Sequence, residues 1–288
     1  MIKYQYQIAG IPLQVEGQSR WMYQDHGVLT PFLLTEEAPP AFTLELEVVE
    51  ELPKPKGDLV LQKPDKRVYR EAAEQISYIG AVEDSPEGAY MQVCRREGHS
   101  HARVLRSKIP GGITPKVVLR AMDAPYLLAQ NRGFLLHASH IRYGDEAIVF
   151  TAPSGVGKST HAQLWMDNRG AELINGDRVA IRVETDGIYA YGVPFTGSSK
   201  VGKWAKLPLR AIVRLRQAPL DTVQPLQGFQ AFRQIWEGCS VNFWNKVTLE
   251  LTSRAVLDTV SAVPVYELAC TPTLSAVTAL ESILEQER

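Results

Sequence analysis

The hydrophobic pattern divides the chain into a first part that favours strands and a second part in which strands and helices alternate. In the first part, residues 4–15 and 42–49 alternate or run with β-branched and aromatic side chains, which is typical of strands. Residues 89–95 and 102–105 have the same character over shorter lengths. We therefore expect a β-rich amino-terminal domain over residues 1–110.

A helical pattern follows at residues 114–131. Apolar side chains recur there close to a 3.6-residue period, after a Thr-Pro pair that is typical of a helix start. Pro125 is expected to kink this helix. The segment 111–132 is therefore expected to bridge two halves of the chain. The apolar positions are Val117, Val118, Ala121, Ala124, Leu127 and Leu128.

Residues 133–288 interleave strands with helices, which is the pattern of an α/β domain. Two apolar runs come first, joined by the turn sequence Tyr143-Gly144-Asp145, and a glycine-rich stretch then precedes a helix. Strands are expected at 134–141, 147–150, 172–174, 179–183, 188–193, 211–215 and 265–268. Helices are expected at 158–167, 229–237 and 274–286.

Composition and charge narrow the classes of protein. The 288 residues are 45% hydrophobic and 22% charged, an ordinary globular composition that argues against disorder. The net charge of −1 argues against a nucleic-acid partner, because phosphate contacts normally leave a basic excess. The sequence has no apolar stretch long enough to span a membrane and no C-x-x-C pair. Residues 1–10 have the pattern of a strand interrupted by polar residues rather than that of a secretory leader. A cytoplasmic protein without a membrane partner is expected.

A glycine-rich motif carries the clearest chemistry. An apolar strand is followed by Ala152-Pro153-Ser154-Gly155-Val156-Gly157-Lys158-Ser159, which opens a helix through Thr160 and has the spacing of a P-loop with Ala in place of the first Gly. Glycines let backbone N–H groups converge on phosphate oxygens, and the helix N-terminus adds partial positive charge. Lys158 is expected to reach the terminal phosphates and Ser159 to bind Mg²⁺. The motif thus predicts binding of ATP with Mg²⁺ through residues 152–160.

Three ordered motifs lead from this loop to a family. They are Leu136-His137-Ala138-Ser139, the loop itself, and Leu173-Ile174-Asn175-Gly176-Asp177-Arg178-Val179, with a weaker continuation at 191–197. Together they resemble the HPr kinase/phosphorylase family, which shares its phosphate-loop core with ATP-dependent phosphoenolpyruvate carboxykinase. They look most like a kinase-like branch of bacterial proteins rather than the HPr-modifying enzymes. The resemblance implies an α/β P-loop kinase core over residues 133–288, beside the β-rich amino-terminal domain.

Asp177 is the expected partner of the loop. It follows Lys158 by 19 residues at the end of an apolar strand, where a P-loop enzyme needs a carboxylate for Mg²⁺ or for the hydroxyl proton. The plainer alternative is a turn-forming Asp in Asn-Gly-Asp. The resembling family carries two adjacent Asp residues here, and this chain has Gly176 in place of the first. That departure leaves one carboxylate for both metal and acceptor, and it weakens the case for a reversible kinase/phosphorylase.

The strand before the loop carries two histidines. Because side chains alternate along a strand, His137 and His140 should point to opposite faces. The resemblance favours His137 as a phosphate-contacting or proton-handling group, and the alternative is a hydrogen-bonded core residue. His161 and the pair His99 and His101 are expected to be structural or surface residues.

Polar and basic residues beyond the motifs have weaker expectations. Asn175 and Arg178 flank Asp177 and are expected to position its carboxylate. A basic set follows a glycine-containing turn and would close over phosphates or an acidic substrate, unless it forms a merely solvated face. These residues are Lys200, Lys203, Lys206 and Arg210.

The resulting hypothesis is an ATP- and Mg²⁺-dependent kinase that transfers the γ-phosphoryl group to a hydroxyl. The acceptor is a Ser or Thr of a protein or peptide, or a small alcohol, and the amino-terminal domain is expected to select it. A homo-oligomer is left open. The alternatives are a phosphoenolpyruvate carboxykinase-like enzyme, an ATP-hydrolysing switch, and a nucleotide-sensing module that lost catalysis with the first Asp.

Overall fold

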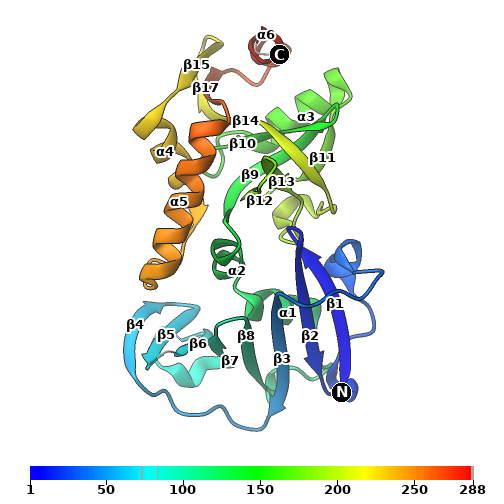
Figure 1. Cartoon of the computed structure of the whole chain (residues 1–288), viewed down its shortest axis with the longest axis vertical. Helices are drawn as coiled ribbons and strands as arrows, with labels where there is room; N and C mark the ends of the chain where they lie inside the picture. Colours follow the sequence, from blue (N-terminus) through cyan, green and yellow to red (C-terminus); the bar gives the residue numbers. More distant parts are fainter. Residues whose placement is uncertain (73, 83, 287–288) are drawn as a thin grey trace. The chain divides into compact units, whose positions relative to one another are not determined.

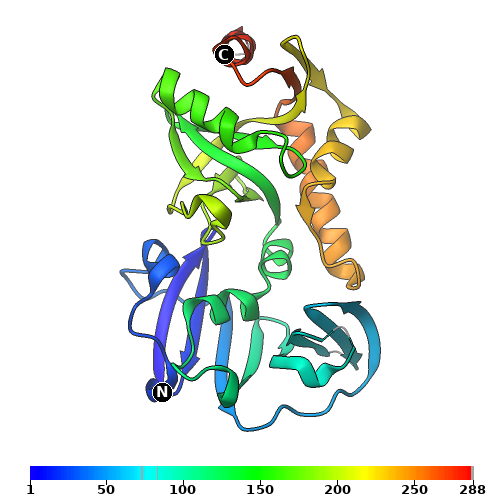
Figure 2. The same cartoon turned by 180° about the vertical axis from the view of Figure 1, so that it is seen from behind.

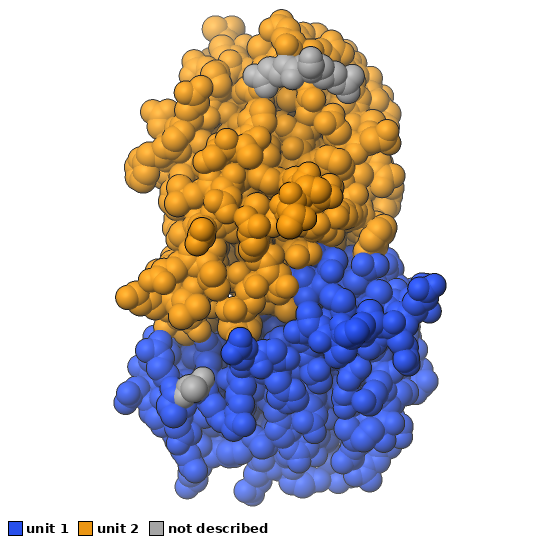
Figure 3. Space-filling view, viewed as in Figure 1, with its two compact units in different colours: residues 1–123 blue, residues 124–288 orange. Residues whose placement is uncertain are grey.

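The structure is a computed structural model that describes residues 1–72, 74–82 and 84–286. It is mixed α/β with two large sheets, and the chain divides into two compact units, Met1–Asp123 and Ala124–Arg288 (Figure 3). We call these the amino-terminal and the carboxy-terminal unit. The division between them falls inside the segment 111–132.

The amino-terminal unit is built on an eight-stranded sheet (Figure 1). Its strands are β1 (Ile2–Ile8), β2 (Ile11–Gly17), β3 (Phe42–Val49), β4 (Asp58–Lys63), β5 (Lys66–Glu71), β6 (Glu74–Gly80), β7 (Ala89–Arg96) and β8 (His99–Leu105). They lie in the order β1-β2-β3-β8-β7-β6-β5-β4, and β3 is parallel to both of its neighbours. The strands expected at 42–49, 89–95 and 102–105 are confirmed.

Two parts of this sheet differ from the expectation. The single strand expected at 4–15 is a hairpin, because Ala9 and Gly10 both take a positive φ (52° and 74°) and reverse the chain between β1 and β2. Strands β4 to β6 were not predicted at all. Charged residues are frequent along β4 and β5, so the apolar alternation that indicates a strand is weak there.

The helix expected at 114–131 is two helices. α1 (Pro115–Met122) ends at Asp123, whose φ of 52° is left-handed, and α2 (Ala124–Gln130) begins at the next residue. The buried carboxylate of Asp123 lies 2.7 Å from Nη1 of Arg95 and 3.6 Å from Nζ of Lys66, which stabilises this uncommon backbone conformation. Pro125 does not kink a helix, because it lies in the first turn of α2, where no hydrogen bond from its nitrogen is needed.

Two long strands, β9 (Gly133–Tyr143) and β14 (Lys206–Gln217), organise the nine-stranded sheet of the carboxy-terminal unit (Figure 2). The other strands are β10 (Glu146–Thr151), β11 (Glu172–Asn175), β12 (Arg178–Val183), β13 (Ile188–Tyr191), β15 (Thr222–Leu226), β16 (Cys239–Ser240) and β17 (Val265–Cys270). The first half of β9 pairs with β12 and its second half pairs with β10 and β11. In the same way β14 passes from β13 to β10 and β17. Within the part of the chain that the structure describes, the parallel pairings of this sheet are those of β14 with β10 and with β17.

Helices cover both faces of the sheet. α3 (Lys158–Arg169) and α6 (Leu274–Gln286) bury side chains such as Trp165 and Leu280 in one core, together with Phe150 of β10. α4 (Gly228–Trp236) and α5 (Lys246–Ala262) bury Ile235 and Val256 in a second core. The strands and helices expected in this half are confirmed in position, with bounds that shift by a few residues.

The helix α5 was not predicted. Its buried face carries Thr248, Thr252 and Thr259, so the apolar periodicity that indicates a helix is interrupted. The side chain of Asn245 caps the helix by accepting a hydrogen bond of 3.0 Å from the backbone N–H of Thr248. Tertiary burial of these threonines stabilises a helix that the sequence pattern does not indicate.

His140 lies in β9 and is completely buried. Neither ring nitrogen has a hydrogen-bond partner among the described residues. Burial, with a smaller contribution from Arg142, lowers the pKa of His140 to about 3. The imidazole is therefore neutral in the folded protein at neutral and mildly acidic pH.

We predict that His140 makes the protein sensitive to acid. The folded pKa lies below the unfolded value of about 6.5, so the unfolded state takes up the proton first. The contribution of neutral His140 to the free energy of unfolding is fully present above about pH 6.5. It decreases by roughly 1 kcal/mol per pH unit as the pH falls toward 3. Urea unfolding of the wild type and His140→Leu at several pH values measures this. If the free energy of unfolding falls equally steeply with decreasing pH in both proteins, the prediction is wrong.

Candidate functional site

The segment 152–157 joins the end of β10 to the start of α3. Gly155 and Gly157 have φ values of +81° and +120°, and a Cβ at either position would meet no atom within 4 Å. The glycines are therefore required by the backbone conformation and not by a lack of space. No side chain caps the N-terminus of α3. Its first N–H groups are available to an anion, and the helix dipole favours negative charge there.

Lys158 is the first residue of α3, and its side chain folds back over the loop. Its Nζ donates hydrogen bonds to the carbonyl oxygens of Ala152 (3.0 Å) and Pro153 (3.4 Å), and the residue is only 7% exposed. Burial lowers the pKa of Lys158. No carboxylate of the described chain forms an ion pair with Nζ, so a phosphate oxygen near the loop would supply the missing negative charge.

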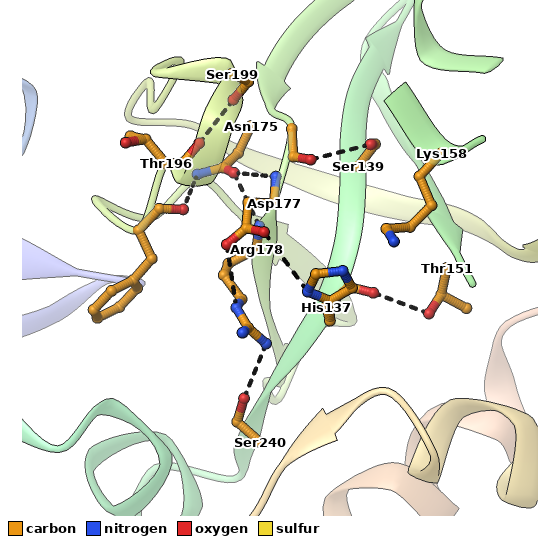
Figure 4. A network of polar contacts seen from close by, with 12 residues as sticks. His137, Ser139, Thr151, Lys158, Asn175, Asp177, Arg178, Thr196, Ser199 and Ser240 are labelled. Carbon is orange, nitrogen blue, oxygen red and sulfur yellow. Dashed lines mark hydrogen bonds and ion pairs between the residues drawn. The ribbon is translucent and has the colours of Figure 1, made fainter. Parts of the chain in front are cut away.

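A second group of residues lies beside Lys158, where β9 meets the turn between β11 and β12 (Figure 4). Nδ1 of His137 is 3.6 Å from Oδ1 of Asp177, and Nε of Arg178 is 3.3 Å from Oδ2 of the same carboxylate. Nη1 of Arg178 also donates a hydrogen bond of 3.1 Å to Oγ of Ser240. The carboxylate of Asp177 thus lies between an imidazole and a guanidinium.

The charge state of His137 follows from its neighbours. Burial lowers its pKa, and the charges of Lys158 and Arg178 lower it further, against the opposite influence of Asp177. The imidazole is therefore neutral at neutral pH and can accept a proton. The expected alternation along β9 is present, since His137 has a side chain 29% exposed toward this cluster while His140 is buried in the core.

The turn that carries Asp177 is held by Asn175, which is fully buried. Its Oδ1 accepts hydrogen bonds from the backbone N–H groups of Asp177 (2.8 Å) and Arg178 (3.0 Å). Its Nδ2 donates to the carbonyl oxygens of Val193 (2.8 Å) and Phe195 (3.1 Å). Asn175 supplies the side-chain hydrogen bonds of the turn, so the carboxylate of Asp177 is left to face His137 and Arg178.

The segment 195–200 lies directly against this turn. Gly197 has a φ of +51°, and a Cβ there would lie 2.6 Å from Cγ of Asp177. A Cβ at Gly176 would lie 2.7 Å from Cβ of Ser199. The space that an acidic side chain at position 176 would need is therefore occupied by Ser199, which gives a physical reason for the glycine at this position.

Three cavities surround the loop. The largest, of about 510 Å³, lies on the side of Gly155, Gly157 and Thr160. A cavity of about 380 Å³ lies on the side of residues 151–154 and is also lined by His137 and Arg178. A third, of about 450 Å³, shares Val156 with the first and Arg214 with the second. The third cavity thus shares lining residues with each of the other two.

Other predicted residues are the two that follow Lys158 and three further histidines. Ser159 and Thr160 are exposed in the first turn of α3. His161 is buried, its Nε2 accepts a hydrogen bond of 3.3 Å from Nε1 of Trp165, and burial lowers its pKa to about 4. His99 and His101 belong to β8 in the amino-terminal unit, where they face glutamates of β3.

The basic set after the turn is largely paired with carboxylates. Lys203 lies 2.7 Å from Glu172 and Lys206 lies 2.8 Å from Glu184, while Arg210 lies 3.7 Å from Glu146. None of these residues lines the cavities beside the loop. The structure does not bring them to the site. Lys200, the fourth, is exposed.

Sequence reasoning missed three residues that line the cavities, Arg214, Gln234 and Glu237. Arg214 lies in β14 opposite Thr151 of β10 in the parallel register, so the pairing of these strands brings it to the loop. No motif marks it. Its strand also carries Lys206, Arg210 and Arg216, so its charge alone does not distinguish it in the sequence.

Comparison with solved structures finds similar chains, and one of them is a kinase/phosphatase. The chain matches an HPr(Ser) kinase/phosphatase from Coxiella burnetii with a TM-score of 0.32 and 13% sequence identity, over 54% of this chain and 99% of that one. No family model and no curated protein matches the sequence. A likeness at this level does not assign the chain to that family, so the resemblance of the sequence motifs remains an expectation.

Two searches for other features gave negative results. In residues 1–72, 74–82 and 84–286, no helix is long and apolar enough to cross a membrane. Over the same residues, no group of three or more His, Cys, Asp or Glu side chains is placed to hold a metal ion.

We predict that Gly197 is required for space as well as for its backbone conformation. Gly144, in the turn between β9 and β10, has a similar φ of +62° but open surroundings, so it is the matched control. Gly144→Ala should cost about 1 kcal/mol for the left-handed conformation, and Gly197→Ala about 1–3 kcal/mol more for crowding of Asp177. Urea unfolding of both variants measures the difference. If both variants lose the same free energy of unfolding, the segment 195–200 shifts to accommodate the new Cβ without strain.

Proposed function

We propose that the chain is an ATP-dependent kinase that transfers the γ-phosphoryl group to a hydroxyl. The observation that carries this proposal is the placement of the Lys158 ammonium beside the His137, Asp177 and Arg178 cluster (Figure 4). A phosphate bound at the N-terminus of α3 would have a cation on one side and a proton acceptor on the other. That arrangement suits phosphoryl transfer, in which catalysis depends on positioning and charge stabilisation.

The cavities suggest where the nucleotide would lie. The phosphates would bind the N–H groups of residues 152–160 and Lys158, and the nucleoside would occupy the cavity of about 510 Å³. Leu215, Cys270 and Pro272 give that cavity apolar walls, which suit a base. The γ-phosphate would then point toward the cavity that His137 and Arg178 line.

Two side chains fit a magnesium ion. The hydroxyl of Ser159 and the carboxylate of Asp177 are oxygen ligands, and Mg²⁺ in kinases is commonly held by one or two protein groups together with substrate phosphates and water. The ion, when bound, neutralises charge that develops between the β- and γ-phosphates.

The proposed step is an in-line transfer of the γ-phosphoryl group from ATP to the acceptor hydroxyl. The acceptor oxygen forms a bond to the γ-phosphorus while the bond from the γ-phosphorus to the β,γ-bridging oxygen breaks, and ADP leaves. The hydroxyl proton passes to the Asp177 carboxylate, or to neutral His137 beside it. Lys158 and Arg178 stabilise the negative charge on the transferring group.

One observation favours a second candidate, a nucleotide-sensing module without transfer. Ser199 occupies the space beside Gly176, so a second carboxylate is absent from the turn. A single acidic residue would then have to serve both the metal and the acceptor. Tight ATP binding with no transfer to any acceptor would favour this candidate over the kinase.

We predict that Lys158→Ala nearly abolishes transfer and weakens binding of ATP with Mg²⁺, because the only buried cation of the loop is removed. Lys203→Ala, which removes an exposed lysine paired with Glu172, is the matched control and should leave both unchanged. Calorimetry measures binding. Incubation with γ-labelled ATP and an extract of the native cells, separated into peptide and metabolite fractions, measures transfer and shows the acceptor class. Unchanged binding and turnover in Lys158→Ala would refute the phosphate site.

We predict that Asp177→Asn lowers transfer by about 10²-fold or more, the usual scale for loss of a general base. The amide keeps the shape of the carboxylate but cannot take the proton or attract Mg²⁺. ATP binding in the absence of metal should hardly change. If the variant keeps near-wild-type transfer to the identified acceptor, Asp177 is not the base, and His137 becomes the next residue to replace.

A further inference from the structure

The cavity of about 380 Å³ lies where the acceptor of a kinase would have to enter. The end of β10 and the start of the loop line it, together with His137, Arg178, Arg214, Gln234 and Glu237. Its volume is in the range of sites for small molecules. The nature of its charged side chains therefore bears on which hydroxyl compound it would take.

Arg214 is the cation of this cavity with the longer ion pair, 3.7 Å against 3.3 Å for Arg178. It is largely buried, with a side chain 15% exposed. Its Nε donates a hydrogen bond of 2.8 Å to Oε1 of Gln234, and Nη2 is 3.7 Å from Oε2 of Glu237, which is too long for a hydrogen bond. In the described part of the chain, no group accepts a hydrogen bond from its two terminal nitrogens.

The nearby carboxylate does not neutralise Arg214 alone. Glu237 is also 3.2 Å from Nε of Arg233, so two guanidinium groups share one carboxylate that is about half exposed. Arg178, the other cation of the cavity, is already bound to Asp177 and Ser240. The lining of the cavity therefore carries excess positive charge, and Arg214 is the group available to a ligand.

A neutral alcohol would form no ion pair with the Arg214 guanidinium. Keeping a guanidinium largely out of water is costly unless its donors are satisfied, and its planar pair of N–H groups matches a carboxylate or a phosphate. We propose that this cavity is the acceptor subsite, and that its acceptor is a small hydroxyl compound carrying a carboxylate or a phosphate that Arg214 binds. This proposal rests on the proposed kinase function and names the class of its substrate.

The position of Arg214 agrees with this role. Its strand places it opposite Thr151, one residue before the loop, so an anionic group on Arg214 lies next to the phosphate site without occupying it. The hydroxyl of the same molecule would reach toward Asp177 and His137 across the cavity. Glu237 competes for Arg214 in the absence of ligand. Removing its charge should therefore strengthen binding of an anion.

The test uses the full-length protein with its phosphate site filled by Mg²⁺ and a non-hydrolysable ATP analogue, so that added anions cannot bind the loop. Calorimetric titration of the analogue comes first. Glycerate and glycerol 3-phosphate are then the probes, and glycerol is the neutral control of the same backbone. The variants are Arg214→Gln, Glu237→Gln and, as the control away from the cavity, Lys203→Gln.

We expect at least one of the two anions to bind the nucleotide-filled protein, and glycerol to bind at least tenfold more weakly. Arg214→Gln should weaken binding of that anion by about tenfold or more, while Glu237→Gln should strengthen it severalfold and Lys203→Gln should leave it unchanged. Binding of the ATP analogue should be the same in all variants, which also shows that they are folded. The anion that binds distinguishes a carboxylate from a phosphate.

Three results would overturn the inference. They are no binding of either anion, equal binding of glycerol, and an affinity that Arg214→Gln does not change. In each of these cases a protein that still binds the ATP analogue keeps the proposed kinase function. Failure to bind the ATP analogue would instead refute the kinase and the acceptor subsite together.

Discussion

The pairing of β9 with strands on both sides is the constraint on which the candidate site depends. Thr151, the last residue of β10, pairs with Ala138, and its hydroxyl donates a hydrogen bond of 3.0 Å to the carbonyl oxygen of His137. The N–H of Ala138 donates one of 3.0 Å to the carbonyl oxygen of Asp177. Two consecutive residues of β9, His137 and Ala138, thus hold the start of the loop on one side and the acidic turn on the other. A shift of one residue in this register would turn His137 into the core.

Charge is the second feature that unites the site. Lys158, Arg178 and Arg214 surround the loop, and the side chains nearest to them supply the carboxylates of Asp177 and Glu237. Lys158 is nearly buried and held by carbonyl oxygens rather than by a carboxylate. Such an arrangement is costly for an isolated protein and becomes favourable when anions occupy the space between the cations. The same physical argument supports both the phosphate site and the acceptor subsite.

The turn at 175–177 shows how closely two segments of the carboxy-terminal unit fit together. In this chain Gly176 allows the close approach of Ser199, while Asn175 ties the turn to the segment at Val193 and Phe195. Gly197 in turn leaves room for the Asp177 carboxylate. The segment 195–200 and the acidic turn therefore fit each other as one unit, which explains why the conformation of one glycine bears on a residue twenty positions earlier.

Local patterns in the sequence determined much of the carboxy-terminal unit. The glycine loop, the strand before it, the helix after it and the alternation of His137 and His140 all depend on neighbours in sequence, for which spacing is sufficient information. Tertiary structure alone decided the rest. The helix α5 exists because buried threonines pack where a sequence pattern requires apolar residues. The break at Asp123 depends on ion pairs with Arg95 and Lys66, and Arg214 reaches the loop only because β14 pairs with β10. These interactions join residues far apart in the chain. Neither composition nor periodicity predicts which distant side chains contact each other.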